Sequence, residues 1–392
     1  MVQEGRSVIR VGFIITFDGS WLGGISYFRN LLTAIYELPD RKIEPVIFTD
    51  MHMSAGRFTD FPPFEVVHSR LLDRFSLPWI VRKVWQRSFD QDLLLERLLS
   101  KHHISVLSHS VQLGKQASIP TIGWIPDFQH RRMPEFFSTA ELAQRERNFG
   151  NVLMCNRVIV SSLDAQADIF AFYPNYAERS RVLQFVAGVD TQVNCPSLDE
   201  VKKKYNIKSR YFHLPNQFWI HKNHHVVIEA LRILKEQGQH VVVLATGNQS
   251  DQRRTNHFQS LMARVEECGL SEEFRVIGIV PYPELMVLMR HSVALLNPSF
   301  FEGWSTTVEE SKALGKRIIL SDIPVHREQS PARGVYFNPH NPETLAFAMK
   351  QQLELWNPDE DIDCAIQSAS ALLSRRQVFA KNYQEIVLEL GS

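Results

Sequence analysis

The sequence predicts an α/β protein made of two doubly wound, Rossmann-like domains, each with a parallel sheet. Short apolar runs rich in β-branched residues alternate with stretches whose apolar residues recur at helical spacing. These alternations form two series, separated by a polar, helix-like stretch at 197–209. With 392 residues, the chain is also too long for one ordinary hydrophobic core.

The first series begins with an apolar run at 8–17, which predicts a strand buried on both faces. A break at 18–24 contains Gly23 and Gly24, and helical spacing starts at Ile25. Further strands are predicted at 45–48, 104–107, 121–125 and 158–162.

The second series predicts five strands and a helix at 225–235. Its strands are expected at 211–214, 241–245, 274–277, 293–296 and 317–320. We therefore expect an N-terminal domain over 1–195 and a C-terminal domain over 196–374. A last helical pattern within 375–392 is expected to pack back against the first domain.

The amino-acid composition favours some classes of protein over others. Apolar residues make up 44% and charged residues 22%, as in soluble globular proteins. The 43 basic and 43 acidic residues balance, which gives no reason to expect nucleic acid as a partner. The four cysteines have no CxxC spacing, and residues 1–10 hold no long apolar run. These features favour a cytoplasmic protein without a zinc site, disulfide framework or signal peptide.

Ligands of open α/β sheets bind at the carboxyl ends of the strands. The active site is therefore expected in a cleft between the two domains. The most informative loop follows the strand that ends at Leu296. Ser305 is expected to cap the next helix by accepting from the Val308 amide. Such a helix start exposes amide groups that suit a diphosphate, and this segment contains Gly303, Trp304, Ser305 and Thr306.

Two carboxylates flank this helix start. Glu302 lies on the loop, and Glu310 lies one turn into the helix. Carboxylates accept paired hydrogen bonds from the hydroxyl groups of a sugar or a ribose. Taken alone, the pair has a plainer interpretation, in which Glu302 caps a turn and Glu310 is a solvated helix charge.

The surroundings favour the first interpretation. The spacing Glu302-x7-Glu310 within PSxFEGWSTTVEE resembles the EX7E element of retaining, GT-B fold glycosyltransferases of family 4. The resemblance extends to the segment from Asn216 and Gln217 to Lys222, where the family carries a basic pair that contacts the diphosphate. Lys222 matches the family lysine, whereas Gln217 stands where the family has arginine. This departure puts in doubt how much of the diphosphate charge the chain neutralises.

The resemblance implies transfer of a hexose, mannose or glucose, from a UDP-sugar or GDP-sugar. The acceptor would be a hydroxyl of a saccharide or of a lipid-linked saccharide, in polysaccharide or glycoconjugate biosynthesis. It implies retention at the anomeric carbon and no metal or other cofactor, although His221, His224 and His225 cluster beside Lys222. A lysine there also makes sense by itself, because an ammonium stabilises a departing diphosphate.

Other candidates are weaker. The resemblance implies that the loop with Gly23 and Gly24 approaches the donor, and that Val280 and Gly247 border the nucleobase. Asp127 and His130 follow a predicted strand and could orient the sugar or the acceptor, in a place where many relatives have a His-Asp pair. Asp127 could equally cap a turn. His109 is a further candidate on the same grounds.

Residues 69–88 mix five basic residues with tryptophan, leucine and isoleucine. This pattern suits either peripheral contact with the inner membrane face or, as the favoured interpretation, an ordinary amphipathic element that covers the first sheet. Two rival functions stay open. One is a related epimerase or phosphorylase, and the other is a degenerate protein that binds a sugar nucleotide or a partner without catalysis.

Overall fold

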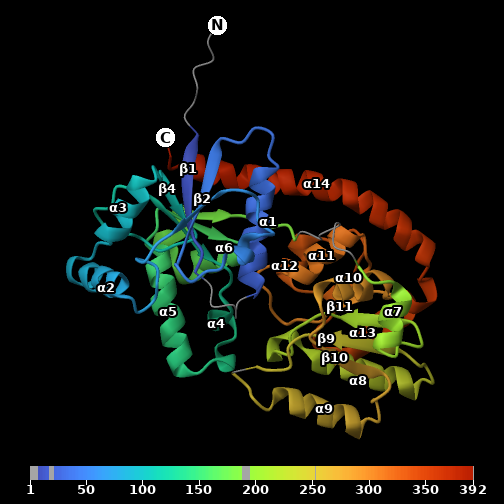
Figure 1. The fold of residues 1–392 in the computed structure, drawn as a ribbon. Coiled ribbons are helices and arrows are strands. Elements are labelled where there is room, and N and C mark those ends of the chain that lie inside the picture. The colour runs from blue at the N-terminus through green and yellow to red at the C-terminus, as the bar shows by residue number, and fades with distance from the viewer. Residues whose placement is uncertain (1–7, 17–21, 188–194, 252, 392) are drawn as a thin grey trace. The chain divides into compact units, whose positions relative to one another are not determined.

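The computed structural model describes residues 8–16, 22–187, 195–251 and 253–391. The chain forms two compact units (Figure 1). Unit 1 consists of residues 1–128, 139–186 and 374–392, and unit 2 consists of residues 129–138 and 187–373. Each unit contains one parallel sheet flanked by helices, so the predicted fold class is confirmed.

Unit 1 contains a seven-stranded parallel sheet with the order β3-β2-β1-β4-β5-β6-β7. Its strands are β1 (Ile9–Ile14), β2 (Ile43–Thr49), β3 (Glu65–His68), β4 (Val106–Ser108), β5 (Thr121–Ile125), β6 (Arg157–Val160) and β7 (Ser180–Val182). Most residues of the inner strands are buried and the others are half-buried, which explains their apolar runs. The edge strands β3 and β7 escaped prediction because both are short and partly exposed.

The helices of unit 1 alternate with these strands, as expected for a doubly wound sheet. They are α1 (Leu22–Tyr36), η1 (Ala55–Phe58), α2 (Leu77–Phe89), α3 (Leu93–Lys101), α5 (Thr139–Leu153), α6 (Leu163–Phe172) and η3 (Pro174–Arg179). Helix α1 begins at Leu22, so Gly23 and Gly24 lie in its first turn. The sequence had placed these glycines in a loop, which was wrong. The rest of the expected break, 17–21, lies outside the described residues.

Unit 2 contains a six-stranded parallel sheet with the order β10-β9-β8-β11-β12-β13. Its strands are β8 (Tyr211–Leu214), β9 (Val242–Thr246), β10 (Phe274–Gly278), β11 (Leu295–Asn297), β12 (Ile318–Ser321) and β13 (Gly334–Phe337). Five of them match predicted strands to within two residues at the start. The sixth, β13, is a half-exposed edge strand that the sequence did not suggest.

Helices flank this sheet, and one core cluster joins the apolar faces of α8 and α13 to its central strands. They are α4 (Gln129–Arg132), η2 (Pro134–Phe136), α7 (Leu198–Lys204), η4 (Ile220–Lys222), α8 (His224–Glu236), α9 (His257–Glu267), α10 (Tyr282–His291), α11 (Thr306–Leu314), α12 (Pro324–Gln329) and α13 (Pro342–Leu355).

The final helix, α14 (Pro358–Leu388), contributes to both units, since residues from 374 onward belong to unit 1. Tyr383 is fully buried and donates a hydrogen bond to Ser108 Oγ at 2.7 Å. Farther along, Glu389 pairs with Arg157 and Arg181. These contacts fix the end of the chain to the first sheet.

Candidate functional site

The site lies in unit 2, where the strand order reverses. Strands β8 and β11 are neighbours in the sheet, but the chain proceeds outward from them in opposite directions. Such a switch point leaves room for a ligand at the carboxyl ends of the strands. The loop after β8 leads to η4 and Lys222, and the loop after β11 carries Glu302.

Lys222 and Glu302 form an ion pair across this switch point. Lys222 Nζ lies 2.7 Å from Glu302 Oε1, and the two side chains are 14% and 9% exposed. Ser299 Oγ donates to the same carboxylate oxygen at 2.6 Å. Burial alone would raise the pKa of Glu302, but the Lys222 ammonium and the Ser299 hydroxyl hold this pKa below its ordinary value. Glu302 is therefore ionised at neutral pH.

A buried network of polar side chains supports the loop after β11. Asn297 Nδ2 donates to Ser305 Oγ at 2.6 Å and approaches His326 Nε2 at 3.4 Å. His326 Nδ1 lies 2.9 Å from the Ser321 carbonyl oxygen, to which it donates. Burial lowers the pKa of His326, so this imidazole is neutral and its Nε2 accepts. The network fixes the loop that presents Glu302.

Helix α11 begins as the sequence predicted. Ser305 is its N-cap and accepts from the Val308 amide at 3.4 Å. The amide groups of Thr306 and Thr307 have no acceptor among the described residues, as is usual in the first turn of a helix, and such free amides suit an anion. Of the other candidates here, Trp304 is buried and Gly303 is partly exposed.

The end of α11 is also fixed. Gly315 is its C-cap in the left-handed conformation, with φ of 62°. A Cβ atom at this glycine would lie 2.3 Å from the carbonyl oxygen of Cys364 in α14. Only glycine fits there, for both backbone and steric reasons.

The adjacent acids Glu309 and Glu310 have opposite environments. Glu309 is 1% exposed, and its carboxylate bonds Lys312 Nζ at 3.0 Å and Gln329 Nε2 at 3.2 Å. The carboxylate of Glu310 is half-buried and has no hydrogen-bond or ion-pair partner among the described residues. Burial raises the pKa of Glu310 to about 7. An unpartnered, partly desolvated carboxyl group is suited to paired hydroxyl donors of a ligand.

The predicted donor-binding loops after β8, β9 and β10 contact one another. Gln217 Oε1 accepts from the Asn248 amide at 2.9 Å, and the Gly247 amide donates to the Gly278 carbonyl at 2.9 Å. Gly247 has φ of 145°, and a Cβ atom there would lie 2.4 Å from the Asn216 carbonyl oxygen. Glycine is therefore required for the loops to pack this closely.

The side chains of two predicted donor-binding residues make contacts within unit 2. The side chain of Asn216 is buried and links the loop after β8 to Asn297 and Thr307, each at 3.4 Å. Val280 is half-buried and packs against the core cluster that includes Val201 and Ile207. Its side chain thus belongs to the packing of α7 and α10.

The three histidines next to Lys222 differ in exposure. His221 and His224 are buried, His225 is exposed, and His224 stacks on Phe218 with ring centroids 4.3 Å apart. Within the described part of the chain, no three side chains of His, Cys, Asp or Glu gather in a way that could hold a metal ion.

The remaining candidates come from two units. Asp127 is half-buried at the end of unit 1, whereas His130 is buried in α4 of unit 2. The segment 129–138 is attached to unit 2 through Arg253, whose guanidinium lies over the rings of Phe137 and Trp219 at 5.3 and 5.5 Å. This attachment was not predicted, because contacts between a cation and aromatic rings of distant segments leave no periodic pattern in the sequence.

His109 is a structural residue. Its Nε2 lies 2.8 Å from Tyr27 Oη, and its Nδ1 lies 2.9 Å from Ser108 Oγ. Ser108 in turn accepts from Tyr383, which gives a continuous chain of hydrogen bonds. Burial lowers the pKa of His109 to about 3, so the ring stays neutral. The weaker interpretation of His109 as a sugar-orienting group therefore gains no support.

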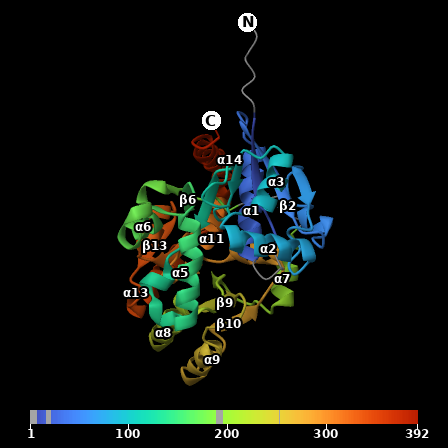
Figure 2. The ribbon, with the colours of Figure 1, turned by 90° about the vertical axis from the view of Figure 1, so that its left-hand side faces the viewer.

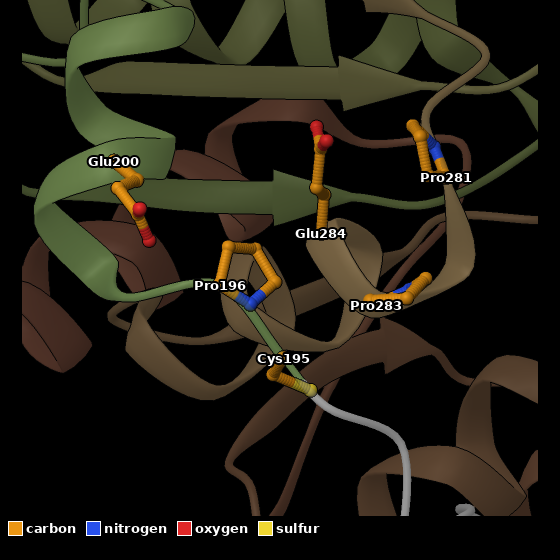
Figure 3. A pocket seen from close by; sticks show the side chains of 6 residues that line it. All are labelled: Cys195, Pro196, Glu200, Pro281, Pro283 and Glu284. Carbon is orange, nitrogen blue, oxygen red and sulfur yellow. The ribbon is translucent and has the colours of Figure 1, made fainter.

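A hollow elsewhere in unit 2 lies between the starts of α7 and α10 (Figure 3). It is lined by Cys195, Pro196, Glu200, Pro281, Pro283 and Glu284. Both of its carboxylates have structural partners. Glu200 completes the capping box of α7 with Ser197, and Glu284 pairs with Lys204 at 2.7 Å. We assign this hollow to helix packing.

Comparison with known proteins agrees with this geometry. Residues 198–368, which lie within unit 2, match the family described as Glycosyl transferases group 1. The chain is 26% identical over 343 residues to the O-antigen chain mannosyltransferase RfbU of Salmonella typhimurium, covering 85% of this chain and 86% of that protein.

Solved structures share the whole fold. A glycosyltransferase from Rickettsia africae superposes with a TM-score of 0.66 at 14% identity, over 98% of this chain and 97% of that one. Anabaena Alr3699/HepE, solved in complex with UDP and glucose, superposes with a TM-score of 0.64 at 17% identity, over 97% and 99%. The two-domain fold is thus that of GT-B glycosyltransferases. In the described residues, no helix combines the length and the apolar character needed to cross a bilayer.

Proposed function

We propose that this chain transfers a hexose from a nucleoside diphosphate sugar to a hydroxyl of a saccharide or lipid-linked acceptor, with retention at the anomeric carbon. One observation supports this above all. The start of α11, with two free amides, lies between an ionised Glu302 held by Lys222 and an unpartnered Glu310. Anion-binding and hydroxyl-binding groups thus occur together at one strand-order switch point.

In the proposed mechanism, the amides of α11 and Lys222 stabilise the charge that develops on the departing diphosphate. Glu302 orients the donor hexose, and Glu310 accepts hydrogen bonds from the ribose hydroxyls. The acceptor attacks from the face that the diphosphate leaves, and a diphosphate oxygen takes the acceptor proton. Retention rests on the resemblance of the Glu302-x7-Glu310 spacing to retaining enzymes.

The proposed biological setting is assembly of a surface polysaccharide or glycolipid. It follows from the name of RfbU, an O-antigen chain mannosyltransferase, and from similarity to WaaG, a glycosyltransferase of lipopolysaccharide biosynthesis. WaaG superposes with a TM-score of 0.57 at 15% identity. We propose mannose or glucose as the transferred sugar.

A thermal-shift screen against UDP, GDP, ADP and their sugars tests the donor. Ligands that bind only the folded state raise its melting temperature. We expect one nucleotide class to stabilise the protein, and Glu310→Gln to reduce that shift. If no nucleotide stabilises the parent protein, the proposal is wrong.

Catalysis needs a separate test. Gln217, bonded to the Asn248 amide in place of the family arginine, favours a second candidate, a sugar-nucleotide-binding protein without activity. Slow hydrolysis of the preferred sugar nucleotide by the parent, lost in Glu302→Gln, would exclude that candidate. Product analysis with radiolabelled donor, with and without acceptor, separates transfer from epimerisation and phosphorolysis.

A further inference from the structure

Helix α2 packs against unit 1 through a polar side chain. Arg82 is its buried residue, and its guanidinium pairs with Asp92 at 2.8 Å, with side chains 9% and 2% exposed. Arg82 also donates to the Leu71 carbonyl at 3.1 Å. Figures 1 and 2 show α2 next to α3 on the outside of the unit. The helix is therefore held by a buried ion pair rather than by an apolar face.

Six apolar side chains of α2 are exposed, whereas Trp79 is half-buried. They recur at positions 77, 80, 81, 84, 85 and 89, which form one continuous stripe on a helix. The middle of this stripe, at Val81 and Val84, faces away from Gln86, and its edge at Trp85 and Phe89 adjoins the buried Arg82. The exposed fractions are Leu77 74%, Ile80 43%, Val81 47%, Val84 61%, Trp85 42% and Phe89 62%.

This orientation overturns the favoured sequence interpretation. An ordinary helix that covers a sheet turns its apolar stripe toward the sheet. Here the stripe faces solvent, although soluble proteins rarely expose a contiguous apolar patch of this kind without a partner.

The turn before α2 extends the apolar surface. Phe75 is 69% exposed and has φ of 69°, a conformation that is unfavourable for a bulky residue. The turn is held by Ser76, whose hydroxyl donates to the Arg70 carbonyl and whose amide donates to the Asp73 carbonyl. The ring of Phe75 is thus exposed beside the start of α2, with the Arg74 guanidinium 4.8 Å from its centroid.

Cations surround the stripe. Arg70, Arg74, Lys83 and Arg87 are exposed, and none has an ion-pair partner among the described residues. Lys83 and Arg87 are four residues apart and flank the stripe on one side. Of the nearby acids, Asp92 is paired with Arg82, and Asp73 is buried and accepts from the Met51 amide. Asp90, at the end of the helix, is exposed.

We propose that α2 and the Phe75 turn form a docking surface for a bilayer that contains anionic phospholipid. The apolar stripe would enter the boundary between headgroups and acyl chains, while the four cations contact lipid phosphates. Charge complementarity selects this occupant over a second copy of the chain. Two such surfaces face to face would bring cations of the same sign together without counter-charges.

Vesicle flotation tests the proposal on the full chain without any sugar nucleotide, so its outcome is independent of the proposed function. We expect the protein to float with vesicles of phosphatidylcholine and phosphatidylglycerol, and to stay behind with phosphatidylcholine alone. Salt at about 0.5 M should weaken the binding, because it screens the attraction between the four cations and the lipid phosphates.

Two variants separate the contributions. Ile80→Ser/Val84→Ser/Phe89→Ser should reduce partition into anionic vesicles roughly tenfold or more, and Lys83→Gln/Arg87→Gln should remove most of the preference for anionic lipid. The matched control changes three side chains of similar exposure on other helices, Phe347→Ser/Leu355→Ser/Ile362→Ser. It should float like the parent.

Three results would overturn the proposal. In the first, the parent fails to float with anionic vesicles. In the second, the control triple variant loses binding to the same degree as the α2 variant. In the third, light scattering after size exclusion would find a dimer that the α2 variant converts to a monomer, which would assign the surface to self-association instead.

Discussion

Lys222 Nζ lies 2.7 Å from Glu302 Oε1 although 80 residues separate the two in the sequence. The contact joins the loops that follow two adjacent strands, β8 and β11. Both groups are largely removed from water, so each compensates the charge of the other.

Replacing Lys222 should destabilise the protein, because the buried charge of Glu302 would lose its counter-charge. Lys222→Met leaves the Glu302 carboxylate buried with Ser299 as its remaining partner, which should lower the free energy of unfolding by about 2–4 kcal/mol. Urea denaturation at neutral pH measures the effect. The double variant Lys222→Met/Glu302→Gln should recover most of the stability without recovering turnover. A double variant no more stable than Lys222→Met would contradict a coupled pair.

Glu309 and Glu310 should respond differently to the same substitution. Glu309→Gln disturbs the bonds to Lys312 and Gln329, so we expect a loss of about 1–3 kcal/mol of stability with donor binding kept. Glu310→Gln removes no contact within the protein, so it should leave the fold intact and weaken nucleotide binding. Parallel melting curves with and without nucleotide test both. If the two variants lose stability and nucleotide binding to the same extent, the different roles assigned to Glu309 and Glu310 are wrong.

The raised pKa of Glu310 predicts a pH dependence of stability. Between 4.5, the ordinary value, and about 7, the folded chain holds a proton that the unfolded chain has released. The free energy of unfolding should therefore fall as pH rises through this window. The contribution of Glu310 should be roughly 1–2 kcal/mol after allowing for its partial contact with water. Glu310→Gln should gain stability relative to the parent at pH 8 but not at pH 4. A constant difference between the two proteins would refute the shifted pKa.

Gly247→Ala should disrupt the packed loops of unit 2. The new Cβ atom would lie 2.4 Å from the Asn216 carbonyl oxygen, so the loop after β8 must move. We expect a loss of about 1–3 kcal/mol of stability together with weaker nucleotide binding. Gly238→Ala is the matched control, because Gly238 also has a positive φ but has no atom within 4 Å of the added Cβ. Nucleotide affinity should be unchanged in the control.

Tyr383 tests the attachment of the C-terminal helix to unit 1. Tyr383→Phe removes the hydrogen bond to Ser108 and should cost about 1 kcal/mol, while Tyr383→Ala also leaves a cavity and should cost about 3–5 kcal/mol. Chemical denaturation of the full chain compares the two. If both variants are as stable as the parent, the contact with Ser108 is unimportant.

The sequence predicted the strands of the two sheets best where they are buried on both faces. An apolar run such as 121–125 is unfavourable in contact with water, so the run itself predicts a buried strand. Edge strands β3, β7 and β13 were missed because exposed positions admit polar residues. The extent of α14 was also underestimated, since its first half, near Asp359 to Ser370, exposes most of its residues and lacks an apolar stripe.

The candidate site was predictable in part. Glu302, Lys222 and the Ser305 cap stand in motifs whose local geometry follows from the chain. Ser299, His326 and Gln329, which hold these groups in place, were not predicted. These three residues act through contacts with segments up to 29 residues away in the sequence, and a local sequence pattern does not indicate such contacts.

Helix α11 is fixed at its start by the Ser305 cap and at its end by Gly315 against α14. A helix held at both ends does not shift along its axis. The backbone position of Glu310, on the second turn, is therefore the same with and without a ligand. A nucleotide would thus meet a rigid template. Binding of the nucleotide would then not have to order α11, so the affinity would not be reduced by that loss of conformational entropy.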